Sequence, residues 1–132
     1  MRASRRAIAL ADAGRDARAL AWEVLRRVEE TDAFADVLLG HRLESSRLER
    51  RDQGFATQLV YGTLAWRGYL DCAIASFAGR PAESLEPAVR TLLELALFQI
   101  LQLERVPAYA AVNSAVDLAK SHRGGRATGL VN

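Results

Sequence analysis

The chain has 132 residues, half of them apolar, with 18 basic and 16 acidic side chains and a formal net charge of +2. This length is enough for one domain with a buried core, and the apolar content excludes a disordered polyelectrolyte. A single cysteine excludes a disulfide scaffold or a cysteine-rich zinc site within this chain, and no apolar run approaches the roughly 20 residues of a membrane span. We expect a soluble protein of a reducing cytoplasm, because the short alanine-rich stretch near the start is interrupted by Asp12, unlike a secretory signal.

The charges are distributed unevenly along the chain. Residues 1–27 hold seven arginines and three acids, residues 28–119 hold eight basic and thirteen acidic side chains, and residues 120–132 hold three basic side chains and no acid. Basic ends around an acidic middle favour a polyanionic partner, most often a nucleic acid. All but one of the 18 basic residues are arginine, which binds phosphate bidentately and stacks on bases, although a GC-rich genome would produce the same ratio.

The N-terminal third predicts an arm followed by two helices. Residues 1–14 lack an apolar period and end at Gly14, so we expect a flexible basic arm there and a folded domain over residues 15–132. The first helix is expected to start at Asp16 as its N-cap, with an apolar stripe of Ala17, Ala21, Val24, Leu25 and Val28. A second helix is predicted over residues 33–45, and a polar connector over residues 44–51.

A long apolar stripe with a helical period runs through the middle of the chain: Phe55, Leu59, Gly62, Thr63, Trp66, Leu70, Ala73, Ile74 and Phe77. We expect a neighbouring helix to approach closely at Gly62, and Gly68 to mark a bend or a break between two helices. The sequence Gly79-Arg80-Pro81 indicates the end of this segment.

Two further helices are expected towards the C-terminus. The first covers about residues 85–104, with Ser84 as its N-cap, and it is apolar nearly all round, which predicts the buried centre of a bundle. The second starts at Val106-Pro107 and has a stripe of Ala111, Val112, Ala115, Val116 and Ala119. A loop over residues 121–126 and the opening of another helix over residues 128–132 are expected to follow. No strand pattern competes anywhere, so the predicted fold class is all-α.

The sequence offers little catalytic chemistry. It contains no glycine-rich phosphate loop, no paired histidine motif for zinc and no nucleophile elbow. We expect His41 on a helix surface, His122 solvated or in contact with RNA, Cys72 as a small buried hydrophobe and Trp66 in the core. Tyr69 could stack on a base, and Tyr61 and Tyr109 stay undecided. The residue chemistry alone therefore does not indicate a self-sufficient enzyme.

Three segments in order resemble the NusB-like family: LVYGTL at residues 59–64, LALFQIL at residues 95–101, and the segment from Val106-Pro107 to Lys120. More closely, they resemble the N-terminal domain of bacterial 16S rRNA (cytosine-C5)-methyltransferases of the Sun type, because LVYGTL followed by Leu70-Asp71 favours that subgroup. The resemblance implies about six to seven helices in two small bundles packed across one another, with the last helix truncated at Asn132. Ser114 departs from the family, which usually has an acid after the preceding asparagine.

The resemblance also implies a function in RNA binding. In free-standing NusB, an arginine-rich N-terminal helix binds RNA together with a ribosomal-protein partner. In the methyltransferases, a Rossmann-like domain that uses S-adenosylmethionine follows and supplies the cysteine nucleophile, so we expect no catalytic, cofactor-binding or metal-binding residue in this chain. The candidate RNA-binding residues are Arg5, Arg6, Arg15, Arg18, Lys120, Arg123 and Arg126.

Two alternatives stay open. The chain could be a free-standing transcription antitermination factor of the NusB type, which binds RNA with a ribosomal protein. It could also be a helical adaptor that binds protein, with Arg15, Arg18, Arg26 and Arg27 on an ordinary solvated helix face, paired with Glu23 and Glu30. The sequence determines neither the oligomeric state nor whether the two basic ends meet in space.

Overall fold

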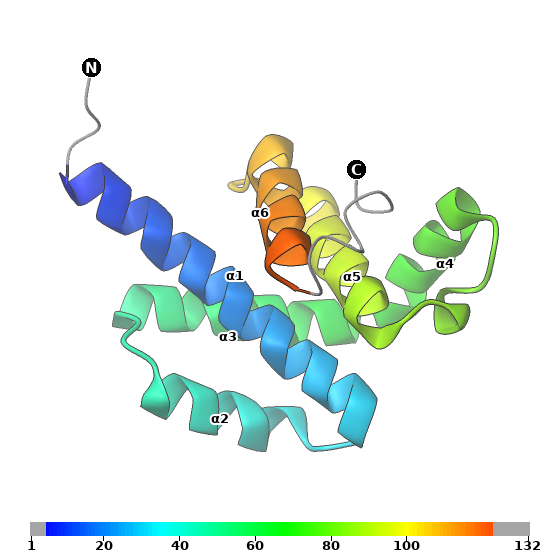
Figure 1. The fold of residues 1–132 in the computed structure, drawn as a ribbon, viewed down its shortest axis with the longest axis horizontal. Helices are drawn as coiled ribbons and strands as arrows, with labels where there is room; N and C mark the ends of the chain where they lie inside the picture. Colours follow the sequence, from blue (N-terminus) through cyan, green and yellow to red (C-terminus); the bar gives the residue numbers. More distant parts are fainter. Residues whose placement is uncertain (1–4, 123–132) are drawn as a thin grey trace.

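The computed structural model of the chain describes the backbone of residues 5–122 and the side chains of residues 16–122. Within this range the fold is all-α, as predicted, with one short 3-10 turn, η1 (Ala82–Ser84), and no strand. The helices are α1 (Arg5–Thr31), α2 (Ala35–Ser45), α3 (Arg50–Ala65), α4 (Arg67–Ala78), α5 (Pro87–Gln102) and α6 (Ala108–Ser121) (Figure 1).

The helices form two groups that pack across one another. Helices α1, α2 and α3 contact each other in the first group, and α5 packs against α4 and α6 in the second. Helix α5 also packs against α1 and α3, so it joins the two groups. Figure 1 shows α1 as the long helix that crosses α3. The predicted central position of α5 and the two-bundle arrangement are therefore confirmed.

Helix α1 starts earlier than the sequence predicts. Its backbone is helical from Arg5, so Asp16 lies within the helix and is not its N-cap, and residues 5–14 of the expected arm are helical. The physical reason is composition: residues 7–13 are mostly alanine and leucine, which favour helix, and one glycine at position 14 costs only about 1 kcal/mol. The side chains of Arg5, Arg6 and Arg15 lie outside the described residues.

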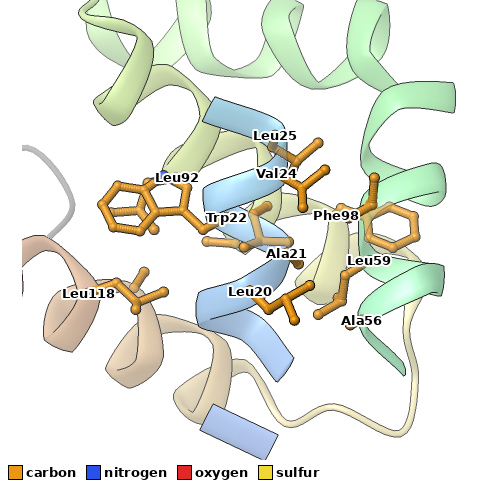
Figure 2. Close-up of a cluster of buried hydrophobic side chains, with 14 of the residues drawn as sticks. Leu20, Ala21, Trp22, Val24, Leu25, Ala56, Leu59, Leu92, Phe98 and Leu118 are labelled. Carbon is orange, nitrogen blue, oxygen red and sulfur yellow. The ribbon is translucent and has the colours of Figure 1, made fainter. Parts of the chain in front are cut away.

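The C-terminal half of α1 passes through the core and contacts both groups of helices. Figure 2 shows Trp22 directed towards Leu92 and Leu118 on one side of α1, and Leu20 directed towards Ala56 and Leu59 on the other. The buried indole N–H of Trp22 lies 3.1 Å from the carbonyl oxygen of Ala88 and 3.1 Å from the hydroxyl of Thr91. A buried indole needs such a polar partner, and here the partners fix the position of α5 on α1.

Gly62 allows the closest approach between α3 and α5. A Cβ atom added to Gly62 would overlap the ring of Phe98, lying 2.6 Å from two of its carbon atoms. The ring is buried and occupies the space that any larger residue at position 62 would need. The predicted close approach of a neighbouring helix at Gly62 is therefore confirmed.

The long central stripe does not continue on one face. Helix α3 ends at Ala65, Trp66 adopts φ −96° and ψ 7°, and α4 starts at Arg67, so the predicted break lies close to Gly68. The break rotates the following helix, and Trp66 is 43% exposed and Phe77 is 87% exposed. The expected core position of Trp66 is therefore wrong. Cys72 is also exposed rather than buried, because the core side of α4 is formed by Leu70 and Ile74.

The ends of the later helices differ slightly from the prediction. Helix α4 ends before Gly79, whose φ of 70° suits glycine. Helix α5 starts at Pro87 with Glu86 before it, so Ser84 is not its N-cap; the Ser84 hydroxyl instead donates to the Pro81 carbonyl oxygen at 2.6 Å within the 3-10 turn. Helix α6 starts directly after Pro107, as expected. The loop beyond His122 and the helix expected over residues 128–132 lie outside the described residues.

Candidate nucleic-acid interface

Arg18 is held in place by uncharged partners. Its Nε donates to the amide oxygen of Gln99 at 2.7 Å, and its guanidinium lies 5.2 Å from the centre of the Phe55 ring. Among the described residues, no carboxylate lies within ion-pair distance of this group. Burial lowers the pKa of the Arg18 guanidinium, but an arginine in a protein stays charged. Arg18 therefore presents a fixed positive charge that lacks a counter-ion in the described fold, which suits a phosphate.

The anchor for Arg18 is itself buried. Gln99 is 2% exposed, and its amide nitrogen donates to the carbonyl oxygen of Leu95 at 3.1 Å, which orients the amide oxygen towards Arg18. Gln99 lies 81 residues from Arg18 in sequence, on α5. In the sequence, Gln99 is a polar residue in a helix that is otherwise nearly all apolar. No local sequence pattern indicates that Gln99 positions an arginine of α1.

The end of α6 lies against α1. The Nη1 of Arg26 lies 3.0 Å from Nδ1 of His122, and the guanidinium of Arg26 lies 4.9 Å from the centre of the Trp22 ring. The His122 ring also makes an edge contact with Trp22, with ring centres 5.3 Å apart. His122, at the C-terminal end of α6, is therefore packed against α1, and the expectation of a plainly solvated histidine is wrong.

Two of the predicted RNA-binding side chains are described by the structure. Arg18 lies in the middle of α1, and Lys120 is exposed in the last turn of α6, the helix whose end contacts α1 at Arg26. Arg123 and Arg126 lie outside the described residues, as do the side chains of Arg5, Arg6 and Arg15. His41 is exposed on α2, as expected.

The adaptor alternative pairs the α1 arginines with Glu23 and Glu30 of the same helix, and the described side chains do not form these pairs. Glu23 instead forms an ion pair with Arg42 of α2. No ion pair within the described residues joins Arg18, Arg26 or Arg27 to Glu23 or Glu30. The guanidinium of Arg18 on α1 is therefore available to an external anion.

Several acidic residues of the middle segment form ion pairs with arginines inside the fold. Arg90 binds Glu29 at 2.8 Å and Asp71 at 2.7 Å, and Arg67 binds Glu94 at 3.1 Å and also pairs with Glu29. These five side chains, which we call the charge cluster, join α1, α4 and α5. Two guanidinium groups thus face three carboxyl groups in a largely buried place.

The excess acid in the charge cluster shifts the ionisation of Glu94. Burial and the adjacent Asp71 carboxylate raise the pKa of Glu94 to about 8. Burial also opposes the charge of Asp71, but hydrogen bonds from Glu94 and Arg90 and the charges of Arg90 and Arg67 outweigh it and lower the pKa of Asp71. A pKa raised this far favours the protonated form of Glu94 at neutral pH, in which two guanidinium groups face two carboxylates.

Phe55, which contacts Arg18, also lines a groove. The groove has a volume of about 490 Å³ and lies between α3 and the loop that connects α5 to α6; Phe55, Gln58, Gln102, Glu104 and Arg105 are among the side chains that line it. The sequence analysis did not find this groove, because no local pattern relates residues 55–58 to residues 102–106.

Exposed aromatic side chains gather on α3 and α4. Tyr61, Trp66 and Tyr69 are all exposed, and Trp66 and Tyr69 meet edge to face with ring centres 6.0 Å apart. Tyr109 is exposed at the start of α6. Tyr69 is therefore accessible, as stacking on a base requires. Within the described residues, acidic, histidine and cysteine side chains do not gather into a group of three that could hold a metal ion. The same residues contain no helix with the length and hydrophobicity of a membrane span.

The arrangement defines a helical bundle with an arginine-bearing first helix, and comparison with known proteins assigns its class. The model of the NusB family matches residues 15–132, so the chain belongs to the NusB family. Two solved structures share the fold. One is described as antitermination factors NusB and NusE in complex with dsRNA, and it has a TM-score of 0.80, 20% identity and coverage of 92% of this chain and 89% of that chain. The other is described as a plectonemic RNA supercoil and has a TM-score of 0.82, 21% identity and coverage of 92% and 88%.

Relatives of two kinds narrow this assignment. The chain is 40% identical over 106 residues to a probable ribosomal RNA small subunit methyltransferase B of Synechocystis sp.. This alignment covers 80% of the chain but only 24% of the Synechocystis protein. A protein of the same description from Bacillus subtilis is 37% identical, with coverage of 81% and 24%. The transcription antitermination protein NusB of Roseiflexus sp. is 33% identical, with coverage of 93% and 89%. The chain thus spans about a quarter of the methyltransferase relatives and most of NusB.

Proposed function

We propose that this chain is the RNA-binding N-terminal domain of an S-adenosylmethionine-dependent 16S rRNA 5-methylcytosine methyltransferase. It acts in the cytoplasm and positions ribosomal RNA for a catalytic domain that lies outside this chain. The cofactor and the nucleophile belong to that catalytic domain. The proposal is supported by the similarity to ribosomal RNA methyltransferases over about a quarter of their length.

The main observation in support of RNA binding is that Arg18 is held in a fixed position without an acidic partner among the described residues. Its guanidinium is fixed by Gln99 and Phe55 and has no acidic partner among the described residues. A phosphate would supply the missing negative charge, and the fixed geometry would reduce the entropy lost on binding. Lys120, on the helix whose end contacts α1, would add a second phosphate contact.

A salt titration tests this proposal. The affinity of the chain for a structured 16S rRNA fragment is measured by fluorescence anisotropy between 50 and 200 mM salt, about the range over which phosphate contacts weaken strongly. We expect the affinity to fall by about tenfold or more as counter-ions compete. An affinity that stays constant over this range would contradict the electrostatic mechanism, and an absence of binding at the lowest salt would contradict the function.

A free-standing antitermination factor is the second candidate. It is favoured by the match to NusB of Roseiflexus sp., which covers 89% of that protein, and by the structural similarity to NusB bound to NusE and dsRNA. Such a factor would bind RNA together with a ribosomal protein. Sequencing the gene beyond the codon for Asn132 separates the candidates: several hundred further codons support the methyltransferase, and a stop within about fifteen supports the antitermination factor.

A further inference from the structure

We propose that the groove beside Phe55 binds one unpaired nucleobase of the RNA strand whose phosphate lies at Arg18. This inference rests on the proposed RNA-binding function and adds to it a base-binding subsite. Its basis is the position of the groove, which shares Phe55 with the cation that we expect to hold the backbone. A strand that places a phosphate at Arg18 therefore has a concave site of small-molecule size next to it.

The lining of the groove suits a base. Phe55 supplies an aromatic surface, and single-stranded RNA is commonly bound by stacking its unpaired bases on such side chains. The amides of Gln58 and Gln102 each carry donors and an acceptor, as the edges of the bases do. Glu104 can accept a hydrogen bond from an exocyclic amino group, which favours cytosine, adenine or guanine over uracil.

The polar groups of the groove are available to a ligand. Within the described part of the chain, Gln58, Gln102, Glu104 and Arg105 make no side-chain hydrogen bond or ion pair. Arg105, which lines the groove, and Arg18, which contacts Phe55, give this region two positive charges, and Glu104 gives it one negative charge. An anionic strand therefore matches the groove better than an acidic peptide, because backbone phosphates would meet the two arginines while the base meets the amides.

Oligoribonucleotides with a single missing base test this subsite. Single-stranded RNAs of one sequence, each with an abasic nucleotide at a different position, are titrated against the chain by fluorescence anisotropy. We expect one position at which loss of the base weakens binding to the wild type by about 5- to 100-fold. In the Phe55→Leu variant, the same abasic change should weaken binding less than it does in the wild type, because the stacking surface is already absent.

Substitutions of the two glutamines test whether their amides recognise the edge of the base. Gln58→Leu and Gln102→Leu keep the side-chain volume and remove the polar edges; both residues are exposed, so the fold should persist in circular dichroism. We expect these variants to reduce the preference for an amino-bearing base over uracil at the sensitive position, while the salt dependence stays that of the wild type. Phe77→Leu removes an exposed aromatic ring that does not line the groove and should change neither quantity.

The outcomes separate this inference from the proposed function. If RNA binds in a salt-dependent manner that requires Arg18, but no position is sensitive to base loss and the groove variants bind as the wild type does, the subsite is wrong and the RNA-binding function stands. If the groove variants lose only the binding of a protein partner, the groove is a peptide site. If no RNA binds at all, the proposed function fails first.

Discussion

The contact between Gly62 and Phe98 predicts that Gly62→Ala destabilises the fold, although Gly→Ala usually stabilises a helix. In an exposed helix interior, Gly→Ala stabilises a protein by about 0.5–1 kcal/mol, because alanine loses less backbone entropy on folding. At Gly62 the new methyl group would overlap the buried Phe98 ring, and overpacking of this kind costs about 1–3 kcal/mol. We therefore expect Gly62→Ala to lower the free energy of unfolding by about 1–2 kcal/mol.

The same helix provides the matched control. Gly54 also lies in α3, and a Cβ atom added there meets nothing within 4 Å. Gly54→Ala should raise the free energy of unfolding by about 0.5–1 kcal/mol, so the two glycine variants should differ in sign. Urea unfolding followed by circular dichroism measures both, provided that the denaturant slope m stays unchanged.

A second substitution tests the cause. Phe98→Leu removes the ring atoms that the methyl group would overlap, so Gly62→Ala should cost less in the Phe98→Leu background than in the wild type. Equal stabilisation by Gly62→Ala and Gly54→Ala would refute the reasoning, because it would show that α3 and α5 are not held at this distance.

Three further predictions concern the polar interior. Burial raises the pKa of Glu94 to about 8 from an ordinary value of 4.5, so the folded state keeps a proton that the unfolded chain has lost. The free energy of unfolding should therefore fall by about 2–4 kcal/mol as pH rises from about 5 to about 8, and Glu94→Gln should remove this fall in urea unfolding measured across the pH range. Arg90→Met leaves Asp71 without its closest cation and Glu29 with Arg67 alone, and it should destabilise by about 3–5 kcal/mol, whereas Arg42→Met, whose pair is much more exposed, should cost below about 1 kcal/mol in the same assay. Trp22→Phe removes the indole donor to Ala88 and Thr91 and should lower the thermal midpoint, corresponding to about 1–3 kcal/mol; an unchanged midpoint would show that these bonds contribute nothing.

Periodic patterns in the sequence predicted the helices because helical packing is largely a matter of local spacing. The stripe of Ala17, Ala21, Val24 and Leu25 is buried as expected, and Gly62 is where two helices meet. The same reasoning failed at Phe77, because it treated two helices as one and carried the phase of the stripe through the break at Trp66.

The burial and pairing of polar side chains were harder to predict from the sequence, because their partners lie far away along the chain. Glu94 and Gln99 are polar residues in a helix that is otherwise nearly all apolar, yet both are buried, since Arg67 of α4 and Arg18 of α1 supply their partners. His122 is likewise placed by Arg26 and Trp22, which lie about a hundred residues earlier. For the candidate site, the sequence indicated Arg18 through charge and family resemblance, but its anchoring by Gln99 and the adjoining groove require the fold.

The central claim is that Arg18 holds an RNA phosphate. The most direct test compares Arg18→Gln with Arg80→Gln, an equal loss of charge in the segment between α4 and η1, in salt titrations of the affinity for a 16S rRNA fragment. We expect Arg18→Gln to weaken binding and to reduce the slope of log affinity against log salt by about one, while Arg80→Gln keeps the slope of the wild type. Equal slopes for Arg18→Gln and the wild type, in a protein that still folds, would contradict the claim.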